Sequence, residues 1–255
     1  MKVAVMMAAY NAAATLDYSL GSLLRQRGDA KLDIIVVNDG STDGTGDVVR
    51  RIAAEAPEIR LIETPNQGIT RTRNMLLDAL APDTDLVTTL DSDDLSPAGR
   101  FARDIRWFAE DPDLDMHYGY MQVFRGAIGD DLAPVASALT ARVRGIHLGT
   151  LLARLPLVQR IGKFDDAFAQ AEDTDYIFRA LELSPNVKLV DDLCYFYRRH
   201  NGNISRDTAT ARRDFARATL MSIRRRRATN APGVPAGFFD GSETLGGIDW
   251  WHGDD

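Results

Sequence analysis

The sequence predicts an α/β fold in which a mostly parallel, mixed sheet carries helices on both faces. Short apolar runs of strand length recur through the first half of the 255-residue chain, and apolar residues at helical spacing lie between them. Three of the first four runs end in polar clusters. Repeated alternation of strand and helix is typical of a parallel sheet that is covered on both sides.

The first half contains four predicted strands, and a predicted helix follows each of them. The strands are Val3–Met7, Leu32–Val37, Ile59–Ile62 and Leu86–Leu90. The helices are indicated by apolar residues of one face: Leu16, Leu20, Leu23 and Leu24, then Val48, Val49, Ile52 and Ala56, then Ile69, Leu76, Leu77 and Leu80, and finally Phe101, Ile105 and Phe108. Pro57 ends the second helix.

The second half is less regular. The pattern predicts a strand over Met116–Phe124, a loop region over Gly126–Arg144, a helix over Asp173–Leu183, a strand end over Tyr195–His200, a basic helix to Arg227 and an irregular tail from Ala228.

Composition sets limits on the class of protein. The fractions of hydrophobic (45%) and charged (26%) residues are those of an ordinary globular protein, and a net charge of -7 argues against a general nucleic-acid binder. The single cysteine, Cys194, excludes an intrachain disulfide, fits a reducing cytoplasm and is expected to be a buried strand residue. The first apolar run, Val3–Ala9, is too short for a signal peptide, and no run is long enough to span a membrane.

Three polar clusters follow predicted strands, and they are Ala9–Asn11, Asp39–Ser41 and Asp91–Asp94. Because ligands of open α/β sheets bind beyond the carboxyl ends of the strands, we expect the clusters to share one rim and to form the binding site. Asp43, which stands just ahead of a helix, is interpreted as a turn or capping residue.

The cluster Asp91-Ser92-Asp93-Asp94 carries three carboxylates within four residues. Such groups repel one another unless a cation lies between them, and Mg²⁺ or Mn²⁺ prefers oxygen ligands. Diphosphate oxygens could complete the coordination of the metal. A solvated acidic turn is the open alternative.

The chain resembles the inverting glycosyltransferases of family 2, which have the GT-A fold. The resemblance runs from Val3 to about Ser205. The matching segments are Ala9-Tyr10-Asn11, Ile34–Thr45, Asn66-Gln67-Gly68 with Arg73-Asn74, Leu90–Asp94, Glu172-Asp173, and Arg198-Arg199-His200 with Ser205. They occur in the order and at the approximate spacing of the family.

The resemblance implies roles for these residues. Tyr10 and Asp39 would hold uracil and ribose, Arg73 would lie near the base or diphosphate, and Ala9, Asn11, Gly68 and Ser92 would also line the donor site. Asp91 would lie near the ribose and the metal, Asp93 would bind the metal, and His200 would close over the metal and diphosphate. Asp173 looks like the catalytic base, with Glu172 on the acceptor side.

The function implied is metal-dependent, inverting sugar transfer from a nucleotide-diphosphate donor, expected to be a UDP-sugar, to a hydroxyl of a carbohydrate or lipid-linked acceptor. Such transfer would serve polysaccharide or glycoconjugate synthesis in the cytoplasm. Thr174 replaces a frequent aromatic next to the base, and Ala9 a frequent proline. The Gln-x-x-Arg-Trp motif of processive members is absent, which predicts one transfer per encounter.

The expected division is a GT-A domain over residues 1–205 and a basic helix with an irregular tail over residues 206–255. Within the domain, residues 1–95 would bind the nucleotide sugar and residues 96–205 would form the acceptor and catalytic half. The run Arg224–Arg227 is either a solvated helix end or a peripheral contact with the inner membrane face.

Two alternatives to an enzyme of this family are a non-catalytic nucleotide-sugar or carbohydrate-binding protein and a phosphotransferase of the haloacid-dehalogenase type. The second is disfavoured because that chemistry uses Thr or Val where this chain has Leu95.

Overall fold

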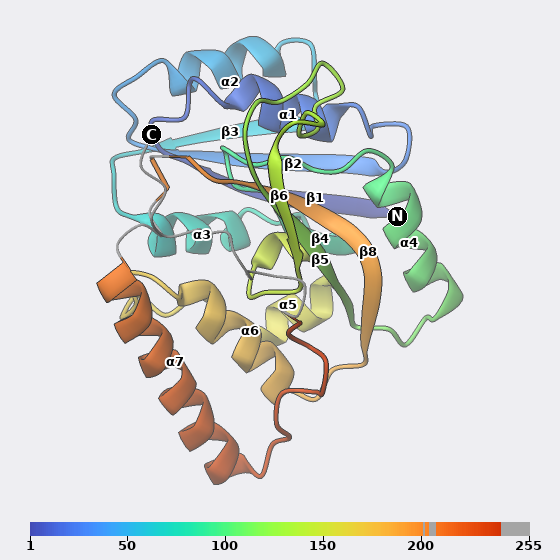
Figure 1. Ribbon diagram of the computed structural model, residues 1–255, viewed down its shortest axis with the longest axis vertical. Helices are drawn as coiled ribbons and strands as arrows, with labels where there is room; N and C mark the ends of the chain where they lie inside the picture. Colours follow the sequence, from blue (N-terminus) through green and yellow to red (C-terminus); the bar gives the residue numbers. More distant parts are fainter. Residues whose placement is uncertain (201, 204–207, 241–255) are drawn as a thin grey trace.

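In the computed structural model, which describes residues 1–200, 202–203 and 208–240, one eight-stranded sheet has helices packed on both faces (Figure 1). The strands are β1 (Lys2–Ala9), β2 (Lys31–Asp39), β3 (Ile59–Thr64), β4 (Leu86–Thr89), β5 (Met116–Arg125), β6 (Leu139–Val143), β7 (Leu151–Arg154) and β8 (Val187–Arg198). The helices are α1 (Leu16–Leu24), α2 (Thr45–Ala53), α3 (Ile69–Asp78), α4 (Arg100–Glu110), α5 (Leu155–Ile161), α6 (Glu172–Glu182), α7 (Thr208–Thr229) and the short 3₁₀ helix η1 (Leu148–Thr150).

The sheet has the order β3-β2-β1-β4-β7-β5-β6, and β8 pairs with β5. β1 to β4 run parallel, with Val5 of β1 opposite Ile34 and Thr88 of its two neighbours. β7 is antiparallel to β4 and β5, whereas β8 is parallel to β5. The predicted mixed, mostly parallel sheet is therefore confirmed, and the ends of β1, β2 and β4 face the same rim.

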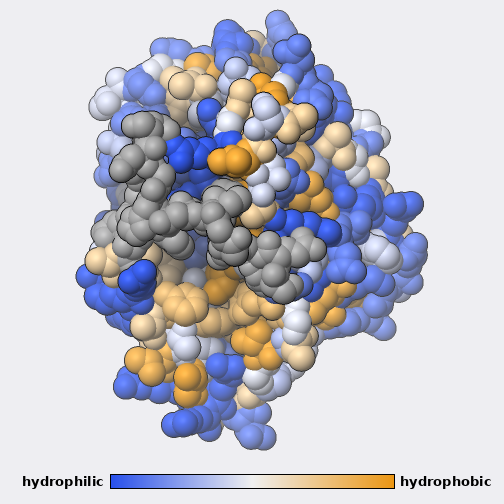
Figure 2. All heavy atoms as spheres, in the orientation of Figure 1, coloured by the Kyte–Doolittle hydropathy of each residue, from blue (hydrophilic) through white to orange (hydrophobic). Residues whose placement is uncertain are grey.

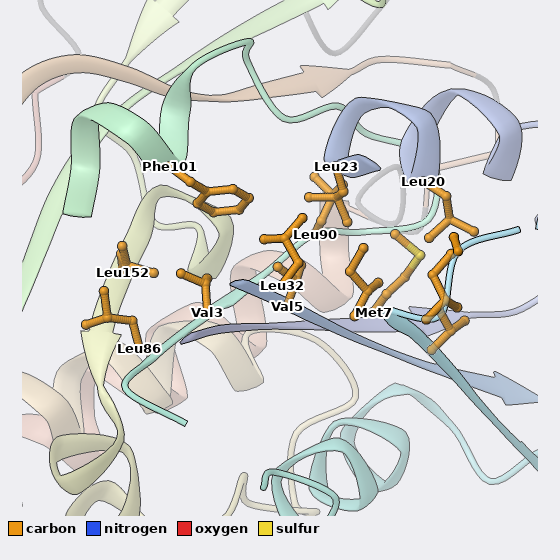
Figure 3. Close-up of a cluster of buried hydrophobic side chains, with 14 of the residues drawn as sticks. Val3, Val5, Met7, Leu20, Leu23, Leu32, Leu86, Leu90, Phe101 and Leu152 are labelled. Carbon is orange, nitrogen blue, oxygen red and sulfur yellow. The ribbon is translucent and has the colours of Figure 1, made fainter. Parts of the chain in front are cut away.

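The alternation of side chains along β1 divides the core between the two faces. Val3, Val5 and Met7 pack against α1, α2 and α4 (Figure 3), while Met6 packs on the opposite side with α3, α5 and α6. Since successive strand residues point to opposite faces, a run that is apolar at every position is what a doubly covered sheet requires.

The second half differs from the expectation. The predicted loop over Gly126–Arg144 is wrong in part, because its end forms β6, which pairs with residues 121–125 of β5. β6 is a sheet edge whose side chains are half-buried or exposed, so it lacks the apolar run of an inner strand. Cys194 is fully buried in β8, as predicted.

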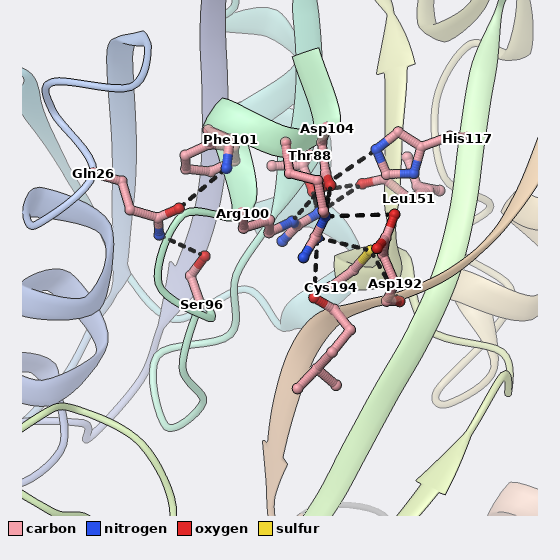
Figure 4. A network of polar contacts seen from close by, with 12 residues as sticks. Gln26, Thr88, Ser96, Arg100, Phe101, Asp104, His117, Leu151, Asp192 and Cys194 are labelled. Carbon is pink, nitrogen blue, oxygen red and sulfur yellow. Dashed lines mark hydrogen bonds and ion pairs between the residues drawn. The ribbon is translucent and has the colours of Figure 1, made fainter. Parts of the chain in front are cut away.

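A buried polar network joins α4 to the sheet (Figure 4). Arg100 donates through Nε to Asp104 at 3.2 Å, and Arg103 donates to the other oxygen of Asp104 at 2.7 Å. Arg100 also donates to Thr88 of β4 and to the carbonyl of Leu151 in β7, at 3.1 and 3.2 Å. The network thus ties the helix that follows the acidic turn to two adjacent strands.

The chain beyond β8 packs back on the domain. Ser222 of α7 donates to Glu182 of α6 at 2.6 Å, and Arg225 bonds to the same carboxylate. After the helix, Phe238 is fully buried and its ring stacks on that of Tyr118, with 4.4 Å between centroids. Among the helices of the described residues, none has the length and apolar character needed to cross a bilayer.

Asp104 is expected to be essential for stability because both its oxygens face buried or half-buried cations. Replacement by the neutral, isosteric Asn (Asp104→Asn) should lower the free energy of unfolding by about 3–5 kcal/mol, as for other broken buried ion pairs. Urea unfolding followed by circular dichroism measures this loss. The control is Asp192→Asn, which removes a partly exposed partner 3.5 Å from Arg103 and should cost under about 1 kcal/mol. Equal losses would contradict the argument.

Candidate functional site

The acidic turn after β4 is fixed by its last carboxylate, that of Asp94, which is fully buried. Tyr195 donates its hydroxyl to one oxygen of Asp94 at 2.8 Å, and the backbone N–H of Arg198 donates to the other at 2.6 Å. Burial, reinforced by the neighbouring Asp93 and Asp91, raises the pKa of Asp94 well above its ordinary value. Asp94 therefore has a structural position, with both oxygens occupied by β8.

Further contacts hold the same turn against β8. Leu95 and Phe196 exchange two backbone hydrogen bonds of 3.0 and 3.1 Å, and the N–H of Asp91 donates to the hydroxyl of Tyr195 at 3.0 Å. The carbonyl of Ser92 accepts from Thr15 and Ser19 at 2.7 and 2.9 Å, which links the turn to the start of the chain as well.

Asp93 and His200 meet at the mouth of the turn although 107 residues separate them. Nε2 of His200 lies 2.8 Å from Oδ2 of Asp93, and the N–H of Gly202 donates to Nδ1 at 3.1 Å. Because an imidazole nitrogen that accepts a hydrogen bond carries no proton, the neutral ring holds its proton on Nε2 and donates it to Asp93. Binding of a metal by His200 would require this proton to leave.

Arg73 of α3 joins the acidic turn to α6. Its guanidinium forms a short hydrogen bond with Glu172 and lies 3.4 Å from Oδ1 of Asp91. Burial would lower the pKa of Arg73, but Glu172 and Asp91 outweigh this effect and raise it above the ordinary value. The cation therefore balances two carboxylates that would otherwise repel each other across the site.

Asp173, the second residue of α6, stands beside Glu172 and is half-buried. Its carboxylate accepts from the backbone and hydroxyl of Thr174 at 2.6 and 3.3 Å. The N-cap position of α6 is Ala171, in the left-handed conformation, so Asp173 is not the capping residue of this helix.

Asp39, at the end of β2, organises the loop before α3. Its two oxygens accept the N–H groups of Gln67 and Gly68, both at 2.9 Å. Gly68 has a φ of 91° and Gly40 a φ of 67°, and a Cβ on Gly40 would lie 2.4 Å from the backbone nitrogen of Asn66. Glycine is thus required at residue 40 for this loop to approach β2.

The loops after β1 and β2 are bonded to each other. Asn11, in the left-handed region, accepts from the N–H of Thr42 at 2.9 Å and donates its own N–H to Ser41 at 2.9 Å. Ala9 is buried at the end of β1, whereas Tyr10 is 53% exposed. Asp43 accepts from the backbone of Ala13 and Thr45, which agrees with its interpretation as a turn residue.

All twelve residues that the sequence proposed for the site are described. Two clusters have direct contacts: Asp93 with His200, and Arg73 with Asp91 and Glu172. Ala9, Tyr10, Asn11, Asp39, Gly68 and Ser92 lie in the strand-end loops, and Asp173 adjoins Glu172. The matching residue Ser205 lies outside the described residues.

The sequence did not identify His147, which faces Asp91, nor Tyr195. His147 precedes an apolar segment and has no spacing relation to another polar residue. Among the described residues, Asp91, Asp94 and His147 form one group of three potential metal ligands, and Asp104, His117 and Cys194 another. The second group suits a cation poorly, because Arg100 and Arg103 already donate to Asp104 and burial raises the pKa of the Cys194 thiol to about 12.

The family model for “Glycosyl transferase family 2” matches residues 4–129, which include the strand-end clusters after β1, β2 and β4. Over these residues the chain belongs to glycosyltransferase family 2. The uncharacterized glycosyltransferase EpsJ of Bacillus subtilis is 26% identical over 219 residues, covering 80% of this chain and 62% of EpsJ. This family 2 chain thus spans less than two thirds of the length of that relative.

Solved structures show the same fold. TarS of S. aureus, residues 1–349 in complex with UDP-GlcNAc, superposes with a TM-score of 0.71 at 20% identity, covering 93% of this chain and 69% of that one. The mannosyltransferase PcManGT from Pyrobaculum calidifontis, in complex with GDP-Man and Mn²⁺, superposes with a TM-score of 0.66 at 19% identity, covering 91% and 65%. The fold of this family 2 member is GT-A, as expected.

Asp39 should be needed for the order of the 66–68 loop. Asp39→Asn places an NH₂ group against one of the two N–H donors, and we expect a cost of about 1–3 kcal/mol in the free energy of unfolding. Amide hydrogen exchange measured by NMR should accelerate at Gln67 and Gly68. The control Asp47→Asn changes an exposed carboxylate on the adjacent helix and should leave both amides unchanged. Unaltered exchange in Asp39→Asn would contradict the anchoring role.

Proposed function

We propose that this chain is a metal-dependent, inverting glycosyltransferase that moves a sugar from a nucleotide-diphosphate donor, a UDP-sugar, to a hydroxyl of a carbohydrate or lipid-linked acceptor. One observation carries the proposal. The acidic turn after β4 contacts His200 through Asp93, while Arg73 links its Asp91 to the Glu172-Asp173 pair. A carboxylate that would bind the metal and a candidate base thus lie near each other on one rim, which supports transfer from a diphosphate sugar.

The donor would occupy the strand-end loops. The exposed ring of Tyr10 offers an apolar face for the base, and Asp39 retains lone pairs beyond those that accept from Gln67 and Gly68. Structural neighbours bound to UDP-GlcNAc and to GDP-Man support a nucleotide sugar as the donor class. The choice of uracil rests on the resemblance to the family.

The residues present suit a hard divalent cation, Mn²⁺ or Mg²⁺. Asp94 is committed to β8, and Arg73 lies against Asp91, so Asp93 is the carboxylate of the turn that would ligate the ion. His200 would join it after loss of the Nε2 proton. A bound cation would neutralise charge that develops on the departing diphosphate.

Asp173 would be the general base. Its carboxylate would take the proton of the acceptor hydroxyl as the acceptor oxygen forms its bond to the anomeric carbon. The bond from that carbon to the diphosphate oxygen breaks at the same time, and the nucleoside diphosphate leaves with the electron pair. Attack from the face opposite the leaving group inverts the anomeric configuration. Arg73, paired with Glu172, would hold the start of α6 in place for this step.

The wider setting is also part of the proposal. Residues 1–205 would form the transferase domain, divided near residue 95, and the protein would act in polysaccharide or glycoconjugate synthesis on the cytoplasmic side. A peripheral membrane contact through Arg224–Arg227 would depend on Arg224 and Arg227, which are exposed. Arg225 is bonded to Glu182 and pairs with Asp175 at 2.9 Å. A non-catalytic binding protein would need no base, and it is distinguished by the variants below.

Asp93→Ala is expected to abolish Mn²⁺-dependent binding of UDP while the protein stays folded, because the variant lacks the carboxylate proposed to ligate the ion. Calorimetry with UDP, in Mn²⁺ and in chelator, measures the effect. Asp47→Ala removes an exposed carboxylate of α2 and serves as the control. Equal affinity of the unmodified protein for UDP in Mn²⁺ and in chelator would refute metal dependence.

Asp173→Asn should reduce transfer by on the order of 10²–10⁴-fold, the usual contribution of a general base, with binding of UDP and Mn²⁺ unchanged. Asn has the size of Asp and can accept the same backbone N–H, so stability should hold. Asp166→Asn, at an exposed carboxylate 3.6 Å from Arg71, is the matched control. Turnover of Asp173→Asn at the level of the unmodified protein, or a product that NMR shows to retain the donor configuration, would exclude this mechanism.

A further inference from the structure

His147 is a buried histidine at the start of η1 whose ring faces the acidic turn. Its Nε2 lies 3.6 Å from Oδ2 of Asp91. This distance is longer than a hydrogen bond, but polar contacts in active sites often tighten only when substrate binds. A small movement would therefore bring Nε2 of His147 within hydrogen-bond distance of Asp91, the first carboxylate of the turn.

The protonation of the ring is set by its other nitrogen. Nδ1 of His147 accepts the N–H of Gly149 at 3.0 Å, so the proton of the neutral ring is on Nε2 and points toward Asp91. A protonated nitrogen cannot ligate a metal. His200 is arranged in the same way, because its Nδ1 accepts the N–H of Gly202 and its Nε2 faces Asp93. Each histidine thus presents an N–H donor to one carboxylate of the turn.

The position of the His147 ring is tightly constrained. Its backbone N–H donates to the hydroxyl of Tyr118 at 3.0 Å, and its ring packs on Tyr195 and Tyr197 with centroids 4.3 and 5.6 Å away. A Cβ on Gly149 would lie 2.0 Å from the ring of Tyr195, so glycine is needed for η1 to approach β8. The ring cannot turn away from Asp91 without disturbing these contacts.

Asp91 is consequently contacted from two sides. Arg73 lies 3.4 Å from Oδ1, and His147 faces Oδ2. Burial would raise the pKa of Asp91, but His147 and then Arg73 outweigh it and hold the pKa well below its ordinary value. The contacts with Arg73 and His147 fix the orientation of this carboxylate beside Asp93.

We propose that His147 is a positioning residue, whose Nε2–H holds Oδ2 of Asp91 so that this carboxylate is correctly oriented toward the metal-bound nucleotide. The inference rests on the proposed function, since it assigns a role within the same donor site. His147, which lies in neither the acidic turn nor α6, would then be one of the groups that determine donor affinity.

Two substitutions separate this role from the support that His147 gives to η1. His147→Gln places an amide NH₂ near the position of Nε2 and removes the acceptor for Gly149. His147→Asn keeps an acceptor near the position of Nδ1 and removes the donor to Asp91. Calorimetry measures binding of UDP and of GDP in the presence of Mn²⁺, and thermal unfolding measures Tm.

We expect His147→Asn to bind the Mn²⁺–nucleotide roughly 10–100-fold more weakly than the unmodified protein, the range known for residues that orient metal-site ligands. His147→Gln should keep most of the affinity although its Tm falls further. The order of affinities is then the reverse of the order of stabilities, which a purely structural role does not produce.

The outcomes distinguish the inference from the proposed function. If the unmodified protein binds neither nucleotide in Mn²⁺, the proposed function and this inference both fail. If it binds but the two variants lose affinity equally, or His147→Gln loses more, the positioning role alone is overturned. Normal affinity in both variants also overturns it.

Discussion

The buried carboxylate of Asp94 holds the acidic turn against β8, and the shape of the site depends on that contact. Through Tyr195 and the backbone of Arg198, it joins two segments about a hundred residues apart. This linkage places Asp93 next to His200, Asp91 next to Tyr195 and His147 next to Asp91. The third aspartate of the motif therefore has a structural role, because both its oxygens accept hydrogen bonds from β8.

The sequence predicted the first half of the fold well, because β1 and most of β2 are buried on both faces and so appear as apolar runs. It failed where strands are short or exposed. β7 has four residues and leads directly into α5, so the two appear as one apolar segment. β6 lies at the sheet edge and has no fully buried side chain, and its pairing with β5 becomes apparent only in three dimensions.

The candidate site was predictable where residue type and strand-end position coincide, as for Asp39, Asp91 and Asp93. The sequence could not show which carboxylate oxygens already accept hydrogen bonds from the protein. Asp39 accepts two backbone N–H groups, and Asp94 accepts a hydroxyl and an N–H. Such partners come from loops and strands distant in sequence. His147 was missed for the same reason, since only the structure shows that its Nε2 faces Asp91 and that its Nδ1 accepts the N–H of Gly149.

The segment after α7 contacts the candidate site indirectly, because Phe238 stacks on Tyr118. Tyr118 receives that ring on one side and, through its hydroxyl, bonds to the backbone of His147. A shortened chain that ends with α7 would expose the face of Tyr118 to water and weaken the packing beneath η1. Phe238 therefore supports the candidate site from behind, although it lies about 90 residues after His147 in the sequence.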